Sequence, residues 1–204
     1  MNWRIEAPNF VERINNPKSF YLTEFSSGAV KALNDRINEA IELGQPIFSI
    51  YVESPGGDVY SLTAMLSIIS AARQKGLQIA TICSGFAASA AAFIFCFGDN
   101  GLRFMGEHAS IMIHGFQVGG IEGKATEQKG FLTEVVKKED SVMQIISTHL
   151  KGGKNKEWLR KELSKRKDVD WYLTSKEAFE LGITDHVGLP VFCLSLIPQI
   201  SIEL

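Results

Sequence analysis

A serine, a histidine and an aspartate lie at three separate places in the chain, each beside a segment with a regular apolar pattern. Ser89 follows a Gly-x-Ala-Ala run in "SGFAASAAAF", His114 ends the apolar run "SIMIH", and Asp170 lies in "DVDWYLTSKEA". A serine hydroxyl becomes a nucleophile when a base is within hydrogen-bond reach, and the base needs a group that orients its other nitrogen. Together these three residue types fit acyl transfer.

Each of these residues also has a simpler interpretation, which is the favoured one when the residue is taken alone. Ser89 fits a packing or helix-capping serine, His114 a core histidine, and Asp170 a surface or capping carboxylate. Thr174 and Glu177 have the spacing of a capping box, which predicts a short helix after the aspartate. The prediction of acyl-transfer chemistry therefore depends on the three residues taken together.

Acyl transfer also needs preorganised donors for an oxyanion, usually backbone N–H groups. We predict a helix from Ser89 to Phe97, and the free N–H groups of its first turn make Ala90 one candidate donor. The turn "SPGG" offers a second, because Pro55 fixes the turn while Gly56 and Gly57 permit positive φ and expose their amides.

The elements that would position these residues alternate between strand and helix patterns. Apolar and β-branched runs predict strands at 19–25, 47–53, 77–83 and 110–114. Apolar residues at helical spacing predict helices at 28–43, 59–75 and 125–150. The alternation predicts an α/β fold with a mainly parallel sheet, in which ligands bind beyond the carboxyl ends of strands. Both "SPGG" and "SGFAAS" follow predicted strands, so we expect them at that edge.

The composition is that of one globular domain. The chain has 204 residues, 45% of them hydrophobic, and a net charge of −2, whereas single cores stop growing near ~250–300 residues. The charges are dispersed, which argues against nucleic-acid binding, and the one basic cluster, Arg160 to Lys167, fits a solvated helix face. Cys83, Cys96 and Cys193 are expected to be buried thiols in a reducing compartment.

No secretory signal or membrane span is predicted. The first ten residues have no apolar core, and the longest apolar stretch, Ala87 to Phe97, is much shorter than the ~20 residues needed to cross a bilayer. We therefore expect a cytoplasmic protein.

Taken in order, the segments resemble the Clp protease proteolytic subunit family, ClpP. The resemblance covers about Ser19 to Val187 and is carried by "SPGGDVYS", "TICSGFAASAAAF", "LRFMGEHASIMIHGF", "VGGIEGKATE" and "DVDWYLTSKEAFELGITD". It implies a ClpP/crotonase-like spiral of β-β-α units in one domain, 1–204, with an N-terminal arm at 1–17 and an apolar tail at 188–204. The helix at 125–150 would be a handle that lies partly between subunits rather than wholly in the core.

The resemblance implies that Ser89 is the nucleophile, His114 the general base and Asp170 the third member of the triad, with Asp168 two positions too early. It implies an oxyanion hole made by the amides of Gly57 and Ala90. Substrate would bind as an added strand between two segments, the first of Gly57, Asp58 and Val59 and the second of Phe116, Gln117, Val118 and Gly119. No cofactor or metal is expected.

The activity implied is that of an ATP-independent serine endopeptidase that cleaves peptides and unfolded polypeptides inside stacked rings, as two heptamers. An AAA+ unfoldase such as ClpX, ClpA or ClpC would feed it, with no nucleic-acid or membrane partner. The short, proline-broken N-terminal segment departs from the family pattern and leaves unfoldase docking open. The sequence resembles a divergent, virus-encoded member, which would place it in the host cytoplasm.

Three alternatives stay open beside this interpretation. A crotonase-type acyl-CoA enzyme would share the fold and the backbone oxyanion hole, but usually works through a carboxylate. A capsid-maturation or signal-peptide-type serine peptidase would have a related fold. An inactive ring subunit is the third, and the presence of all three triad residue types argues against it. The glycine-rich segment and the long helix favour ClpP.

The two aspartates can be separated by mutation. We expect Asp170→Asn to reduce turnover by orders of magnitude, because an amide no longer holds the imidazole in the required tautomer. Asp168→Asn is the matched control and should change turnover little. Steady-state hydrolysis of a short peptide measures both, and a greater sensitivity at Asp168 would show that the segment is misaligned.

Overall fold

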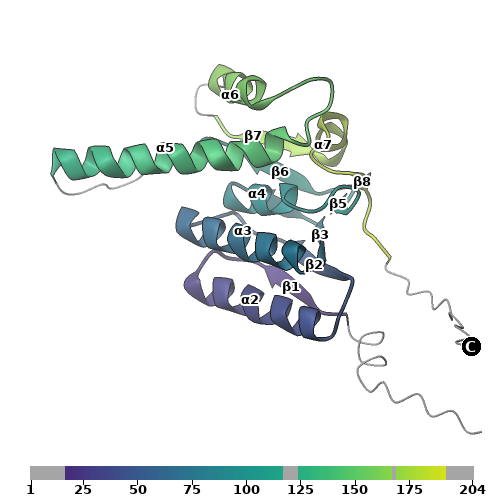
Figure 1. The fold of residues 1–204 in the computed structure, drawn as a ribbon. Helices are drawn as coiled ribbons and strands as arrows, with labels where there is room; N and C mark the ends of the chain where they lie inside the picture. The colour runs from purple at the N-terminus through teal and green to yellow at the C-terminus, as the bar shows by residue number, and fades with distance from the viewer. Residues whose placement is uncertain (1–16, 117–123, 167–168, 192–204) are drawn as a thin grey trace, which may run out of the picture.

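The computed structural model describes residues 17–116, 124–166 and 169–191 (Figure 1). These parts form the following elements: β1 (Ser19–Leu22), α2 (Ser27–Glu42), β2 (Ile47–Val52), α3 (Val59–Gln74), β3 (Gln78–Cys83), β4 (Phe86–Ala88), α4 (Ala90–Cys96), β5 (Arg103–Met105), β6 (Ser110–Ile113), α5 (Ala125–Ser147), α6 (Lys156–Lys165), β7 (Trp171–Thr174), α7 (Ser175–Leu181) and β8 (His186–Val187).

Two sheets carry the fold. The larger one has the order β1-β2-β3-β5-β8, and every neighbouring pair in it is parallel. The smaller one has the order β4-β6-β7, in which β4 and β6 are parallel while β6 and β7 are antiparallel. In Figure 1 the helices α2, α3 and α4 are stacked one above another alongside the larger sheet. The predicted α/β class with a mainly parallel sheet is confirmed.

The core follows from the periodicities of the elements. In β2 alternate side chains, those of Phe48, Ile50 and Val52, are fully buried, as expected for a strand with one face on the core. In contrast, α4 consists of alanines, phenylalanines, an isoleucine and a cysteine, and all seven of its residues are buried. A helix that is apolar all round lies inside a protein, so α4 is a core helix.

The observed structure differs most from the sequence prediction in the segment "SGFAAS", which was predicted as a turn. Phe86–Ala88 forms β4, which pairs with β6, and the helix begins at Ala90 rather than at Ser89. Alanine-rich sequence has little strand preference, so this strand exists because of its tertiary pairing. The short strands β5 and β7 were also not predicted, although the aromatic and β-branched residues of β7 favour a strand.

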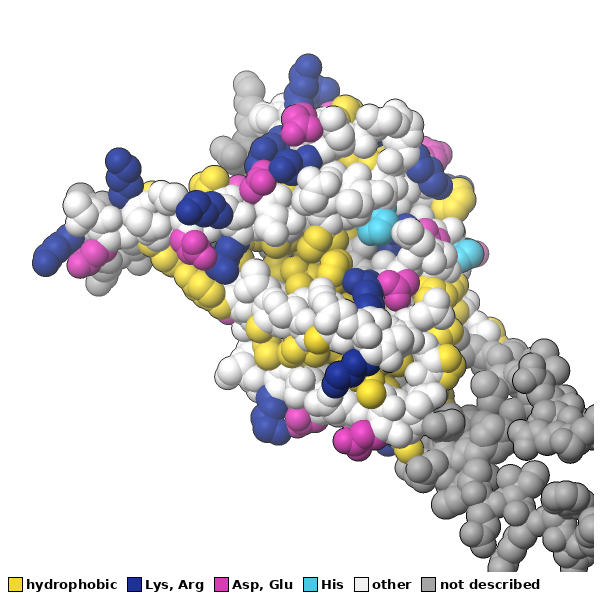
Figure 2. Space-filling view, viewed as in Figure 1, with side chains coloured by type: hydrophobic (Ala, Val, Ile, Leu, Met, Phe, Trp, Pro, Cys, Tyr) yellow, Lys and Arg dark blue, Asp and Glu magenta, His cyan; other side chains and the backbone are white. Residues whose placement is uncertain are grey.

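Helix α5 has two halves with different surroundings. Towards its C-terminal end Val142 and Ile146 are buried in the core. Its N-terminal half projects beyond the body of the molecule in Figure 1, and there Phe131, Leu132 and Val136 are exposed. Figure 2 shows hydrophobic side chains along the underside of this projection. The helix is thus a core element at one end only.

Several smaller predictions can be checked. Cys83 and Cys96 are buried free thiols, whereas Cys193 lies outside the described residues. The capping box of Thr174 and Glu177 is present at the start of α7. The glycine-rich segment at 117–123, most of the N-terminal arm and most of the C-terminal tail also lie outside the described residues. Within the described parts, no helix combines the length and the apolarity that crossing a membrane requires.

A buried ion pair joins β5 to the segment before β8. Arg103 is only 3% exposed, and its Nε and Nη2 donate to the two carboxylate oxygens of Asp185 at 2.9 and 2.6 Å. Burial alone would raise the pKa of Asp185, but the hydrogen bonds and charge of Arg103 outweigh it and lower the pKa. Ionised Asp185 therefore contributes its full stabilisation of the folded state above the unfolded-state pKa of ~3.9. This contribution is lost as pH falls through the folded-state pKa.

We expect Asp185→Asn to reduce the free energy of unfolding at pH 7 by about 3–5 kcal/mol, because it leaves a buried guanidinium unpaired. Urea denaturation measures this. The control is Asp35→Asn, which breaks an exposed pair with Lys31 and should have little effect. Equal effects from the two substitutions would contradict the importance of the buried pair.

Candidate active site

Ser89 has an unusual backbone conformation at the junction of β4 and α4. Its φ is 54° and its ψ is −123°, and it is the only non-glycine residue with positive φ in the described parts of the chain. Such conformations cost on the order of 1–3 kcal/mol and cluster at functional sites. Although Ser89 is the N-cap residue of α4, its side chain makes no capping hydrogen bond. The helix-capping interpretation is therefore wrong.

The "SPGG" turn packs directly against this junction. A Cβ atom on Gly56, where φ is 101°, would lie 2.7 Å from the carbonyl oxygen of Ala88 and 2.8 Å from Cβ of Ser89. Only glycine permits this approach. On its other side Ser89 donates its N–H to the carbonyl of Met112 in β6 at 2.9 Å. The junction is held between the turn and the second sheet.

Two amides beside Ser89 are available for a ligand. Within the described residues, the N–H groups of Gly57 and Ala90 donate to no acceptor of the protein. The N–H of Gly56, in contrast, donates a hydrogen bond to Oγ of Ser54 at 3.2 Å. Backbone N–H groups are almost always paired, so free ones in a pocket suggest a ligand site. These are the two amides that the sequence predicted as oxyanion donors.

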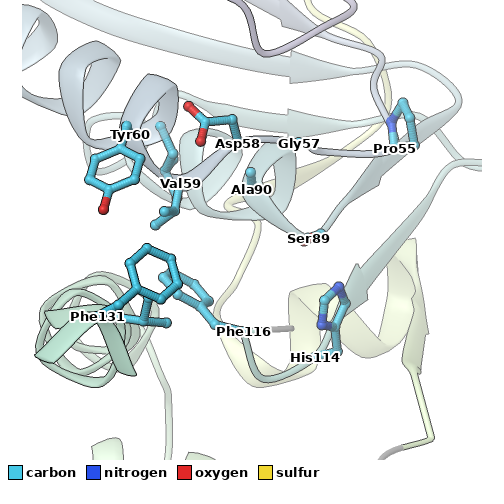
Figure 3. A pocket seen from close by; sticks show the side chains of 12 residues that line it. Pro55, Gly57, Asp58, Val59, Tyr60, Ser89, Ala90, His114, Phe116 and Phe131 are labelled. Carbon is cyan, nitrogen blue, oxygen red and sulfur yellow. The ribbon is translucent and has the colours of Figure 1, made fainter. Parts of the chain in front are cut away.

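A pocket of about 420 Å³ opens next to Ser89 (Figure 3). Its walls are formed by Pro55, Gly57, Asp58, Val59, Tyr60, Leu62, Ser89, Ala90, His114, Phe116, Phe131 and Val135. The structure therefore brings together the predicted serine, the histidine, both amides and the described residues of the predicted substrate groove. Gln117, Val118 and Gly119 lie outside the described residues.

The histidine and the aspartate are related through the β6–β7 ladder. Ile113 pairs with Trp171, so one further step along this register brings Asp170 opposite His114. Within the described residues, however, Nδ1 of His114 contacts the carbonyl oxygen of Gly115 and makes no hydrogen bond to Asp170 or Ser89. Ser89 and His114 line one pocket and the register brings Asp170 close to His114, but these residues do not form a connected triad. Catalytic hydrogen bonds are often long in unliganded sites. Asp168 lies outside the described residues.

Sequence reasoning missed the contribution of α5 to the pocket. Phe131 and Val135, one helical turn apart, line it, and Phe131 lies across from Tyr60 (Figure 3). Glu139 on the same helix accepts a hydrogen bond from the backbone N–H of Phe116 at 2.7 Å. The apolar stripe of this helix was visible in the sequence, but nothing there showed that part of it faces the site. The handle helix thus touches the segment that follows His114.

Neither of the two described cysteines lines the pocket, and both thiols are buried. Burial, together with the charge of Glu53, raises the pKa of Cys83 to about 12. Burial also raises the pKa of Cys96 to about 12. Only the thiolate is a competent nucleophile, so both remain inert at neutral pH. Ser89 is the nucleophile candidate that the pocket offers.

The fold and the pocket define an α/β protein with a strained serine, a histidine and two free amides around one cavity. The family model of Clp protease matches residues 37–190, about three quarters of the chain. The chain belongs to the Clp protease family.

Curated relatives agree with this assignment. Proteins named ATP-dependent Clp protease proteolytic subunit are 36% identical over 139 residues in Porphyromonas gingivalis and 34% identical over 149 residues in Bacteroides thetaiotaomicron. These matches cover 68% and 73% of this chain, but only 58% and 63% of the relatives. A Bacteroides fragilis protein of the same name is 34% identical, with 67% of its length covered. The chain thus spans about three fifths of the first two relatives.

The strain at Ser89 can be measured. We expect Ser89→Gly to be more stable than Ser89→Ala by about 1 kcal/mol, because glycine adopts positive φ without a steric cost whereas alanine keeps the strain. Denaturant unfolding of both variants tests this. As a control, Ser67→Gly in the interior of α3 should be less stable than Ser67→Ala. A Ser89→Ala variant as stable as Ser89→Gly, or more stable, would show that Ser89 is unstrained.

Proposed function

We propose that this chain is a serine endopeptidase subunit, a single ClpP-like domain that hydrolyses peptides and unfolded polypeptides. The observation that carries the proposal is the strained, uncapped Ser89 in one pocket with His114 and two free amides. Membership of the Clp protease family supports it, because the curated relatives are named as proteolytic subunits. In this proposal Asp170 is the third residue of the triad.

The chemistry follows from these roles. His114 accepts the proton of the Ser89 hydroxyl as its oxygen attacks the scissile carbonyl carbon. The carbonyl oxygen becomes an oxyanion, which the N–H groups of Gly57 and Ala90 stabilise. The protonated His114 then gives its proton to the leaving amine as the C–N bond breaks. Water, deprotonated by His114, attacks the acyl-enzyme and releases the acid and Ser89. Asp170 keeps the imidazole oriented throughout.

The pocket suggests how substrate binds. Its walls beside Ser89 are apolar at Leu62, Phe116, Phe131 and Val135, so an apolar side chain next to the scissile bond fits it. Extended substrate would add as a strand between the turn after β2 and the segment after His114. Main-chain hydrogen bonds would hold it there with little dependence on the substrate's sequence. The N–H of Phe116 is already bound by Glu139, so the remaining groups of these segments would hold the substrate.

We further propose that the protein acts in the cytoplasm, or in the host cytoplasm if a virus encodes it, as two stacked heptameric rings. An AAA+ unfoldase such as ClpX, ClpA or ClpC would supply unfolded chains. The exposed apolar side chains on the projecting half of α5 support assembly, since they are unpartnered in the single chain. Because α5 also holds Phe116 through Glu139, packing against a second subunit would help to order the segment next to His114.

Replacement of the nucleophile tests the function. Ser89→Ala should reduce hydrolysis of a short fluorogenic peptide by roughly 10⁴- to 10⁶-fold, as removal of triad members does, with an unchanged native mass. Ser67→Ala, which removes a hydroxyl that bonds only within α3, is the control. Activity of Ser89→Ala within tenfold of wild type would refute the assignment.

Assembly should be coupled to activity. Val136 is 57% exposed on the projecting half of α5, so Val136→Glu leaves the core intact and places a charge on the apolar surface. We expect a smaller native mass and at least tenfold lower peptidase activity, against little change for Thr133→Glu at an exposed polar position. Native mass spectrometry and peptide hydrolysis are measured together. A fully active monomer would contradict the coupling.

A further inference from the structure

The carboxylate of Glu53, directly after β2, organises the turn between β3 and β4. Its Oε1 accepts hydrogen bonds from the N–H of Ser84 at 2.6 Å, the hydroxyl of Ser84 at 2.5 Å and the N–H of Gly85 at 2.8 Å. Its Oε2 accepts from the N–H of Phe86 at 3.1 Å. One side chain thus receives three successive amides and a hydroxyl.

The turn is closely fitted to this carboxylate. A Cβ atom on Gly85 would lie 2.9 Å from Oε2 of Glu53, so glycine is the residue that permits the contact. Partial burial would raise the pKa of Glu53, but the hydrogen bonds from Ser84, Phe86 and Gly85 outweigh it and hold the pKa below its usual value. The carboxylate is therefore ionised at neutral pH, and charge-assisted hydrogen bonds are stronger than neutral ones.

From this contact two chain segments run side by side to the pocket. Ser54 bridges to Ala87, with its N–H donating to the carbonyl of Phe86 at 3.1 Å and its carbonyl accepting from Ala88 at 3.0 Å. Gly56 then packs on Ser89. Glu53 lies at the outer end of the paired segments, and the free amides of Gly57 and Ala90 lie at the inner end.

We propose that Glu53 is a positioning residue that aligns the two halves of the oxyanion hole with Ser89. One donor amide, that of Gly57, belongs to the segment that begins at Glu53, and the other, that of Ala90, belongs to the segment that Glu53 binds. A slip of one segment along the other would separate the donors, and stabilisation of an oxyanion requires donors already in place. This inference rests on the proposed peptidase function.

The test is Glu53→Gln, which keeps the size but removes the charge and one acceptor. We expect kcat to fall roughly 10- to 100-fold, since small misplacements at a reacting centre have effects of this size. KM should change less than about twofold because the walls of the pocket stay intact. Melting temperature and native mass are recorded alongside, and Glu180→Gln, at an exposed position on α7, is the matched control.

A double-mutant cycle shows whether the effect passes through the contact. Gly85→Ala should lower kcat in the wild type by displacing the carboxylate, but should have no further effect in a Glu53→Ala background, where the new methyl group has room. Independent losses in the two backgrounds would overturn the proposal. If Glu53→Gln does not fold, Ser84→Ala, which removes only one of the four donors, takes its place with an expected few-fold loss of kcat.

Labelling with a fluorophosphonate separates this proposal from the function on which it rests. A wild-type protein that is not labelled on Ser89 would refute the peptidase function. A wild-type protein labelled on Ser89, with Glu53→Gln labelled at the same rate and equal in kcat, would refute the positioning role alone. Slower labelling of Glu53→Gln, in a protein that is folded at the assay temperature and keeps its native mass, is the result that the structure predicts.

Discussion

The site depends on the close packing of the "SPGG" turn against the junction of β4 and α4. Gly56 approaches Ala88 and Ser89 more closely than any side chain would permit, and this contact keeps Gly57 near the start of α4. Ser89 in turn holds a positive φ that only its surroundings can maintain. The strained backbone of Ser89 therefore depends on a neighbour, Gly56, that has no side chain.

The secondary structure explains why this arrangement is stable. The turn extends β2, an interior strand of the parallel sheet, while the junction extends β4 and leads into the fully buried α4. Both are therefore anchored in buried elements of the fold. His114 comes from a different direction, at the end of β6, and its following segment is held by Glu139 of α5. The serine and its amides are set by the core, whereas the histidine also depends on a helix that projects from it.

Elements with their own sequence pattern could be predicted, whereas features that depend on contacts between distant segments could not. The helices at 28–43 and 59–75 have strong apolar periodicity and formed within one or two residues of their predicted bounds. The strand β4 could not be predicted because its alanines acquire strand geometry only by pairing with β6. Likewise, the sequence predicts Glu53 only as the last residue of a strand. Its proposed positioning role depends on hydrogen bonds from amides some thirty residues away. The proximity of Ser89 and His114 was predicted from the combined pattern of motifs, but their lack of a hydrogen bond depends on side-chain geometry that no pattern encodes.

A crystal structure of the protein after reaction with a fluorophosphonate would test the central claim most directly. Phosphorus should be bonded to Oγ of Ser89, and the phosphoryl oxygen should lie within hydrogen-bond distance of the N–H groups of both Gly57 and Ala90. That result would show that the turn and the junction together form the oxyanion hole. A phosphoryl oxygen directed away from these amides, or phosphorus bonded to a different residue, would contradict the account.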